Sequence, residues 1–458
     1  MVSHDIHEYL KPGRRAHLVG VGGVSMSPLA EVLHGAGLTI TGSDMQESRT
    51  VARLRSVGIH VVIGHLAESV RGVDCVIRTA AVHDDNPEIA AARAAGIPVF
   101  ERAQAWGALM RHYRNALCVA GTHGKTTATS MCTHIFMAAQ ADPTVMIGGT
   151  LPMLGVGHRV GQGDTIIMES CEYCDSFLSF FPTVAVILNV DADHLDYFED
   201  LNAVERSFRA FARLVPLTGY VVANAEDKNT MDTLANLDRS ILTFGVNQGN
   251  VKANNLSWVS GMGEFDITVN DSFYAHVALK VPGLHNVKNA LAAAAAAYVL
   301  SIPGNAVEDG LASFIGAGRR FEHKGEFNGA QIYDDYAHHP SELEALLTTA
   351  KTLGYSRVIC AFQPHTYTRT KELFDEFVRV LKLADVAVLA EIYAAREKNT
   401  IGISSRDLTK HIPGSRYFAT LPEVTAALTE LARPGDLILT VGAGDIYTVG
   451  EALVSRKN

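Results

Sequence analysis

A short glycine loop between an apolar segment and a helical one constrains the fold most strongly. The apolar segment is Ala116–Ala120, and the loop after it reads Gly121-Thr122-His123-Gly124-Lys125-Thr126-Thr127. A strand that enters a glycine turn and leaves it as a helix points backbone N–H groups and the positive end of the helix dipole at an anion. Lys125 then neutralises phosphate oxygens, and the Thr126 hydroxyl is a ligand for Mg²⁺. The segment predicts an α/β unit that binds ATP through the whole loop.

The loop departs from the usual phosphate-binding pattern by its length. Val119 stands where that pattern has its first glycine, and Gly121 lies closer to Gly124. A glycine turn that merely precedes a helix is the alternative. The coincidence of strand, Gly-x-x-Gly-Lys-Thr and helix favours the nucleotide site.

Short apolar runs alternate with helical stretches along the rest of the chain, which is typical of α/β domains with parallel sheets. Because 458 residues exceed the usual size of one domain, about 100–200 residues, we expect three. Residues 1–110 are predicted to form a Rossmann-like domain, 111–318 a central P-loop ATPase domain, and 319–458 a second Rossmann-like domain. The strands and the helix expected in them are Ala16–Val21, Leu38–Thr41, Asp74–Thr79, Ile97–Phe100, Glu264–Val269, the alanine-rich helix Val287–Leu300, Val358–Phe362, Val386–Glu391 and Leu437–Val441, with a further strand at Ile332.

Composition excludes several classes of protein. The net charge of −10 comes without a run of Lys and Arg, so a nucleic-acid partner is not expected. The longest apolar run, Ala290–Leu300, is far below the ~20 residues of a membrane span. Six cysteines suit a reducing cytoplasm, and the pair Cys171 and Cys174 lacks the second ligand pair that a zinc site needs. We therefore expect a cytoplasmic globular protein.

A second glycine turn lies near the N-terminus. Gly20, Gly22 and Gly23 follow the first apolar segment, and Asp44 follows the next one. This is the order of a dinucleotide fingerprint, but Ser25 stands at its third glycine. The same turn at a helix N-terminus suits the pyrophosphate of a UDP-sugar. A dinucleotide site, a UDP-sugar site and a purely structural turn all remain open.

Six segments, in order along the chain, carry a specific resemblance. They read GTHGKTT (121–127), HNVKNA (285–290), GRRFE (318–322), DDYAHHP (334–340), FQPHTYTRT (362–370) and EIYAAREK (391–398). Together they resemble the Mur ligase family, and the resemblance extends over essentially the whole chain. It implies an N-terminal domain for a UDP-sugar, a central ATPase, and a C-terminal domain that closes over the site.

The resemblance also implies a reaction. A Mur ligase uses ATP and Mg²⁺ to phosphorylate the carboxylate of a UDP-linked sugar acid, and the amine of an amino acid then expels phosphate. A carboxylate repels nucleophiles and has no good leaving group, and phosphorylation removes both obstacles. FQPHTYTRT and EIYAAREK favour the branch of the family that joins L-alanine to UDP-N-acetylmuramate in peptidoglycan precursor synthesis.

Two other functions remain as alternatives. The branch that recycles murein tripeptide shares the GTHGKT and Asp-Asp-x-Ala-His-His segments. A non-enzymatic nucleotide switch would lack a dedicated substrate domain and would show no turnover that depends on an amino acid. The sequence does not decide between a monomer and a homodimer.

The resemblance assigns site residues by position. For ATP it implies the loop residues, Asn286, Asn289, Arg320 and Asp335; for the metal, Thr126, Glu169 and His194; for the substrate, Gly20, Gly22, Gly23, Ser25, Asp44, Tyr336, His338, His365 and Arg369. Lys125, His194, His338 and Arg369 are the expected catalytic residues, and Glu391, Arg396 and Glu397 are expected near the amino acid.

The residues themselves allow plainer interpretations of some of these positions. His194 also fits a partly buried histidine at a strand end, Asn286 an N-cap, and Arg320 a charged linker. Arg369 is chemically suited to a carboxylate or acyl phosphate. The role of Glu172 is left open, because much of this branch of the family has a different acidic run there.

Overall fold

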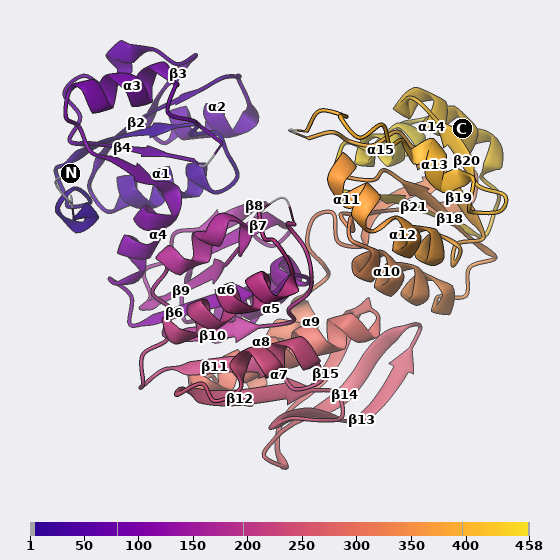
Figure 1. Ribbon diagram of the computed structural model, residues 1–458. Coiled ribbons are helices and arrows are strands. Elements are labelled where there is room, and N and C mark those ends of the chain that lie inside the picture. Colours follow the sequence, from indigo (N-terminus) through magenta and orange to yellow (C-terminus); the bar gives the residue numbers. More distant parts are fainter. Residues whose placement is uncertain (1–4, 80, 196, 396, 457–458) are drawn as a thin grey trace.

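The computed structural model describes residues 5–79, 81–195, 197–395 and 397–456. Three sheets with flanking helices follow one another along the chain, and the first and third units lie on the same side of the central one (Figure 1). The predicted α/β class with three domains is confirmed. None of the helices in the described ranges is long and apolar enough to cross a membrane.

The N-terminal sheet is fully parallel and has the order β3-β2-β1-β4-β5. Its strands are β1 (Arg15–Val19), β2 (Thr39–Asp44), β3 (His60–Ile63), β4 (Cys75–Arg78) and β5 (Val99–Glu101). Its helices are α1 (Met26–Gly35), α2 (Arg49–Ser56), α3 (Pro87–Ala94) and α4 (Arg102–Met110), with short 3₁₀ turns at Ile6–Glu8 and Ala67–Val70. Strand β1 ends before the expected Val21, because the backbone turns at Gly20 with a φ of 77°.

The central sheet has ten strands in the order β15-β14-β13-β12-β11-β10-β6-β9-β7-β8. They are β6 (Asn115–Ala120), β7 (Thr144–Leu151), β8 (Val156–Arg159), β9 (Thr165–Glu169), β10 (Val184–Ile187), β11 (Tyr220–Asn224), β12 (Ser240–Gly245), β13 (Val251–Val259), β14 (Met262–Val269) and β15 (Ser272–Pro282). The helices are α5 (Lys125–Ala138), α6 (Leu201–Arg213), α7 (Lys228–Leu234), α8 (Leu284–Val299) and α9 (Gly304–Ser313), with a 3₁₀ segment η3 (Tyr173–Ser179). Strands β8, β14 and β15 are antiparallel to their neighbours, and the remaining strands form a parallel core.

The C-terminal sheet has the order β16-β17-β21-β18-β19-β20, and only β16 is antiparallel among its described strands. The strands are β16 (Glu322–Phe327), β17 (Ala330–Asp335), β18 (Arg357–Phe362), β19 (Val386–Ala390), β20 (Arg416–Phe418) and β21 (Asp436–Val441). The helices are α10 (Pro340–Thr352), α11 (Tyr367–Glu372), α12 (Phe374–Leu381), α13 (Ser405–Thr409), α14 (Leu421–Leu431) and α15 (Tyr447–Ser455).

Helices α5 and α8 form the packed centre of the molecule. The alanines between Ala290 and Ala297 in α8 are fully buried, and so is Leu291, the one other residue in this run. Small side chains let the helix lie close to β11, β12 and β13. The alanine run is therefore a packing feature of the predicted helix.

Helix α4 joins the N-terminal unit to the central one. A Cβ on Gly107 would lie 1.9 Å from the carbonyl oxygen of Ser179, so glycine is needed where α4 meets η3. Trp106 of α4 and Phe177 of η3 belong to one buried apolar cluster. This cluster spans both sheets, and it fixes the N-terminal unit against the central one.

Candidate active site

The glycine loop connects β6 to α5 as predicted. Gly121 and Gly124 have φ values of 146° and 82°, which favour glycine. The Nζ of Lys125 donates hydrogen bonds to the carbonyls of Gly121 at 2.6 Å and Thr122 at 3.1 Å, so the lysine folds back over its own loop. This conformation places a cation and the N-terminus of α5 at one point, which is a site for an anion.

Lys125 also pairs with a residue whose role the sequence left open. Its Nζ lies 3.0 Å from the Glu172 carboxylate, and both side chains are largely buried. Burial disfavours the charged lysine, but the adjacent Glu172 carboxylate outweighs it and holds the pKa of Lys125 above its usual value. Glu172 therefore keeps the lysine charged within the loop.

Thr126 and Glu169 form a pair of oxygen ligands beside the loop. The Thr126 hydroxyl donates to the Glu169 carboxylate at 2.9 Å, and the other carboxylate oxygen accepts from the Gly148 amide at 2.6 Å. A hydroxyl and a carboxylate at hydrogen-bonding distance are the donors that Mg²⁺ prefers. The residues present thus fit the predicted magnesium ion.

His194 follows β10 with a φ of 55°, an uncommon conformation for a residue other than glycine. Its Nε2 lies 3.9 Å from Glu172 and 3.9 Å from Asp193. It lines the same cavity as Lys125 and Glu169. The structure therefore brings the predicted metal residues to one cavity wall.

That cavity has a volume of about 1440 Å³ and is lined by all three units. Val24, Ser27, Arg49 and Arg53 come from the N-terminal unit, the phosphate loop from the central one, and Tyr336, His338, His365 and Arg369 from the C-terminal one. Four of the predicted substrate residues therefore meet the predicted ATP and metal residues at one place.

An ion pair connects the C-terminal wall of the cavity to the central unit. Arg369 lies 2.7 Å from Asp193, and its guanidinium also approaches Nδ1 of His365 at 3.3 Å. Burial alone would raise the pKa of Asp193, but Arg369 and nearby histidines hold it well below its usual value. Asp193 was not predicted as a site residue.

His338 stands beside this pair as a neutral imidazole. Burial lowers the pKa of His338 to about 4. Its Nδ1 lies 3.0 Å from the Tyr336 carbonyl, so the proton belongs on Nδ1 and Nε2 is left as an acceptor. The histidine is therefore suited to accept a hydrogen bond from a bound molecule.

A second cavity of about 260 Å³ lies between the central and C-terminal units. It is lined by the predicted ATP residues Asn286, Asn289, Arg320 and Asp335, together with apolar side chains such as Phe314 and Leu346. Burial raises the pKa of Asp335 to about 6, although Arg320 acts against that shift. Both cavities contain Gly124 and Arg320, so they adjoin at the phosphate loop.

Helix α8 supplies the amides of the smaller cavity. Asn286 is not an N-cap, because Gly283 takes that position and Asn286 is buried inside the helix. Its side chain donates to the Pro282 carbonyl at 2.7 Å and approaches Asn289 at 3.4 Å. The plainer interpretation of Asn286 was thus wrong.

The N-terminal glycine turn is closed by its own acidic residue. The Gly22 amide donates to Asp44 at 2.8 Å, and Trp106 donates to the Ser25 carbonyl at 3.2 Å. The hydroxyl of Ser25 is buried without a hydrogen-bond partner. The large cavity of about 1440 Å³ is lined by the neighbouring Val24 and Ser27. It is not lined by the predicted substrate residues of this turn, which are Gly20, Gly22, Gly23, Ser25 and Asp44.

The residues expected near the amino acid have structural partners. Glu397 accepts hydrogen bonds from the Tyr367 and Thr368 amides at 2.6 and 3.1 Å, which caps α11. Glu391 accepts from the hydroxyls of Ser404 and Tyr417, each at 2.7 Å. Arg396 lies outside the described residues. Glu397 therefore supports the segment that carries His365 and Arg369, whereas Glu391 fixes the start of α13 against β20.

Three models of the Mur ligase family match the chain in succession. The family's catalytic domain matches residues 15–114, its middle domain 119–297, and its glutamate ligase domain 319–444. A UDP-N-acetylmuramate–L-alanine ligase from Clostridium novyi is 42% identical over 448 residues, which cover 97% of this chain and 98% of that one. One from Caldanaerobacter subterraneus is 44% identical over 98% of this chain and 99% of its own.

Solved structures agree with this match. The crystal structure of UDP-N-acetylmuramate–alanine ligase from Thermotoga maritima has a TM-score of 0.80 and 31% identity, covering 96% of this chain and 98% of its own. A murein peptide ligase from Psychrobacter arcticus has a TM-score of 0.71 at 24% identity over 97% and 98%, so it shows the fold alone. The matches cover nearly the whole chain, and the chain belongs to the Mur ligase family.

Proposed function

We propose that this protein joins L-alanine to UDP-N-acetylmuramate at the expense of ATP, through an acyl phosphate, in peptidoglycan precursor synthesis. The observation that carries the proposal is the 1440 Å³ cavity in which side chains from three units surround the phosphate loop. Relatives that match over 97% or more of the chain are named for this reaction. A reaction that uses ATP and a UDP-linked precursor belongs in the cytoplasm.

ATP would extend across the two adjoining cavities. Its base and ribose would occupy the smaller cavity beside Asn289 and Asp335. Its phosphates would lie on the loop at Lys125, which lines the larger cavity. A phosphate would replace the Gly121 and Thr122 carbonyls as the partner of the lysine. The positive end of α5 would then face the same oxygens.

Thr126, Glu169 and His194 are the residues that would hold Mg²⁺. The ion would supply positive charge that neutralises the transferring phosphoryl group. Glu169 is already oriented by the Gly148 amide and the Thr126 hydroxyl. Little rearrangement of the protein oxygens is then required.

UDP-N-acetylmuramate would enter from the N-terminal wall. Arg49 and Arg53 line the cavity on that side and suit a pyrophosphate, while Arg369 on the opposite wall suits the sugar carboxylate. The unpartnered Ser25 hydroxyl beside the glycine turn supports a ligand at the N-terminus of α1. The diphosphate would thus bind far from the end of the sugar that reacts.

In the first step a carboxylate oxygen attacks the γ-phosphorus and the bond to ADP breaks. Lys125 and Arg369 stabilise the charge that spreads over the phosphoryl oxygens. In the second step the neutral amine of alanine attacks the acyl carbon, inorganic phosphate leaves with its bonding electrons, and the proton that the nitrogen loses passes to phosphate or to water. Nε2 of His338 would accept a hydrogen bond from a substrate and orient it.

A substrate panel tests the proposal. Phosphate release is measured with ATP, Mg²⁺ and UDP-N-acetylmuramate, adding L-alanine in one arm and the tripeptide L-alanyl-γ-D-glutamyl-meso-diaminopimelate in the other. We expect turnover with L-alanine, and a product that has gained one alanine by mass spectrometry. Turnover with the tripeptide and none with L-alanine would assign the protein to the branch that recycles murein tripeptide. A rate of phosphate release that depends on neither acceptor would reject the ligase function.

A further inference from the structure

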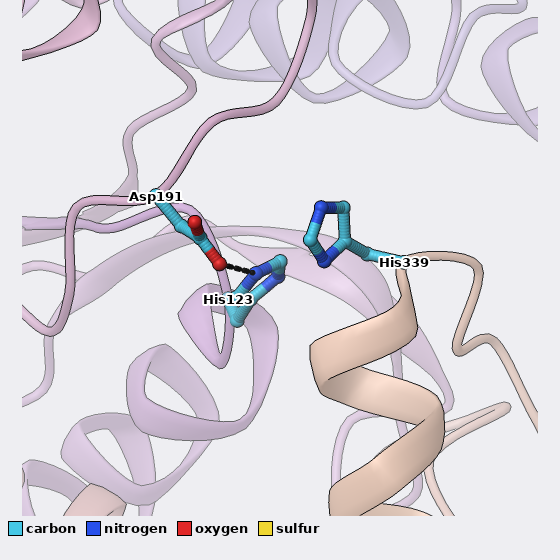
Figure 2. A group of neighbouring side chains, drawn as sticks. All are labelled: His123, Asp191 and His339. Atoms are coloured by element: carbon cyan, nitrogen blue, oxygen red, sulfur yellow. Dashed lines mark ion pairs between the residues drawn. The ribbon is translucent and has the colours of Figure 1, made fainter. Parts of the chain in front are cut away.

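Two histidines and an aspartate meet where the central and C-terminal units touch. His123 belongs to the phosphate loop, Asp191 follows β10, and His339 is the N-cap of α10. One ligand atom of each lies within 4.8 Å of those of the other two. Figure 2 shows the His339 ring turned toward His123, with Asp191 on the other side of His123.

The Nε2 atoms of the two imidazoles make no hydrogen bond at this point, although that of His123 forms an ion pair with Asp191. Nε2 of His123 and Nε2 of His339 are buried and have no hydrogen-bond partner, and His339 is only 2% exposed. The Asp191 carboxylate lies 3.5 Å from Nε2 of His123, which is long for a hydrogen bond. Buried polar atoms normally find a partner, so the unpartnered Nε2 of the buried His339, next to the His123–Asp191 ion pair, indicates a missing ligand.

We propose that a divalent transition metal such as Zn²⁺ binds between His123, Asp191 and His339 and bridges the two units. Two imidazole nitrogens and one carboxylate oxygen suit Zn²⁺ and its neighbours in the first transition row. Mg²⁺ prefers oxygen ligands throughout. The site shares no residue with the Thr126, Glu169 and His194 set.

The surrounding hydrogen bonds orient the ligands as in metal sites. Nδ1 of His339 lies 3.1 Å from the Ser341 hydroxyl, and Nδ1 of His123 lies 3.4 Å from the Glu342 carboxylate. Asp191 accepts from the Ala192 amide at 2.8 Å. Such outer contacts fix the ring orientation and leave Nε2 for a metal. The Asp191 side chain is 39% exposed, which gives an ion a path from solvent.

A metal at this position has a mechanical consequence. His123 and Asp191 come from the central unit and His339 from the C-terminal one, so the ion would tie α10 to the phosphate loop. All three ligands are close together only when the central and C-terminal units are in contact. The metal therefore stabilises the state in which these two units are in contact, by mass action. Bound Zn²⁺ therefore raises the melting temperature of the protein.

Titration of the full chain with Zn²⁺ and with Co²⁺ tests the site. The parent protein carries Cys171→Ser and Cys174→Ser, because those exposed thiols also bind zinc, and excess Mg²⁺ fills oxygen-rich sites. We expect calorimetry to show one strong Zn²⁺ site. With Co²⁺ we expect visible absorption bands that indicate a cobalt ion of low coordination number. His339→Asn keeps an N-cap acceptor but removes Nε2, and Asp191→Asn keeps an acceptor for the Ala192 amide.

Each of these two variants should weaken Zn²⁺ binding by roughly tenfold or more and abolish the rise in melting temperature. His276→Ala is the matched control, because it removes a histidine that pairs with Asp266 on the surface, and it should bind as the parent does. Folding is checked by circular dichroism. A parent that does not bind Zn²⁺, or site variants that bind it as tightly as the parent, would overturn the proposal.

Discussion

At the scale of single residues, Lys125 is the side chain on which the reaction depends most. It sits at the N-terminus of α5 with only 14% of its side chain exposed, and Glu172 holds it charged. Lys125→Ala removes this charge from the phosphates in the transition state, so we expect kcat to fall by about 100-fold or more. Steady-state phosphate release with saturating substrates measures the effect.

Lys228→Ala is the control for that variant. Lys228 is a lysine on the surface that pairs with Asp232, and its loss should leave kcat unchanged. A Lys125→Ala enzyme with the kcat of wild type would remove the lysine from the chemistry.

From the residue pattern alone, site residues were predictable only where their role is local, and those of the C-terminal domain came from the resemblance to a family. The glycine loop identifies Lys125 and Thr126 because strand, turn and helix are consecutive in the chain. Glu172 and Asp193 could not be found in this way, because each is defined by a partner from another segment. Arg369 and Asp193, for example, are 176 positions apart.

At the scale of elements, the start of α5 depends on the conformation of one glycine. Gly124 has a φ of 82°, and a Cβ there would lie 2.8 Å from the Asn289 amide oxygen of α8. Gly124→Ala should therefore distort the loop and weaken ATP binding, measured by calorimetry with a non-hydrolysable analogue. Gly354→Ala is matched, because Gly354 has a φ of 79° and open space around it.

The comparison of these two variants separates backbone strain from collision. Both should lose stability through the positive φ, by about 1 kcal/mol. Only Gly124→Ala should lose affinity for nucleotide. Equal affinities in the two variants would contradict a role of the α5–α8 contact in forming the loop.

The contact of α5 with α9 should make stability depend on pH. His134 of α5 is buried against Phe314 and bonds the Ser313 hydroxyl at 2.7 Å, and burial lowers the pKa of His134 to about 4. Between pH 6.5 and 4 the unfolded chain binds a proton at this residue that the folded chain does not. The free energy of unfolding therefore falls on acidification, by up to about 3 kcal/mol.

His134→Gln stays neutral over this range and should lack that contribution. Its melting temperature should lie furthest below that of wild type above pH 6.5, and the difference should shrink toward pH 4. His60→Gln, on an exposed histidine, is the control and should follow wild type. A difference that does not change with pH would show that folding does not shift the pKa of His134, and it would contradict this prediction.

Elements with continuous apolar runs were predicted well. Strands β6, β18 and β21 lie within one residue of their expected bounds, because buried parallel strands are apolar on both faces. The hairpin of β7 and β8 and the meander of β13, β14 and β15 were missed except near β14. Strand β13 has mostly half-buried or exposed residues, so its sequence does not show a continuous apolar run.

At the scale of the whole molecule, the three domains were expected but their contacts were not. The central and C-terminal units touch through Arg369 and Asp193 and through Ser341 and Asp191, whose oxygens are 3.1 Å apart. The N-terminal unit meets the central one through Glu31 and His158 at 3.2 Å. Such pairs depend on how whole domains dock, and local patterns in the sequence do not predict the docking of domains.

In this structure these contacts join the three units, and we expect the units to separate during turnover so that substrates enter and ADP leaves. Joining should be favoured by ligands, because the cavities bind ATP and the UDP-sugar with residues from more than one unit. We therefore expect the radius of gyration from small-angle scattering to fall when a non-hydrolysable ATP analogue and UDP-N-acetylmuramate are added together.

Asp193→Asn tests which contact holds the arrangement. Arg369 and Asp193 are 11% and 7% exposed, and removing one partner of a buried ion pair costs about 3–5 kcal/mol, here only in the joined form. The variant should therefore have a larger radius of gyration than wild type without ligands and need more ligand to reach the compact value. Glu344→Gln, which breaks an exposed pair with Arg379 inside the C-terminal unit, should scatter as wild type does. If Asp193→Asn and wild type gave one radius at every ligand concentration, with occupancy shown by calorimetry, the ion pair would have no part in closure.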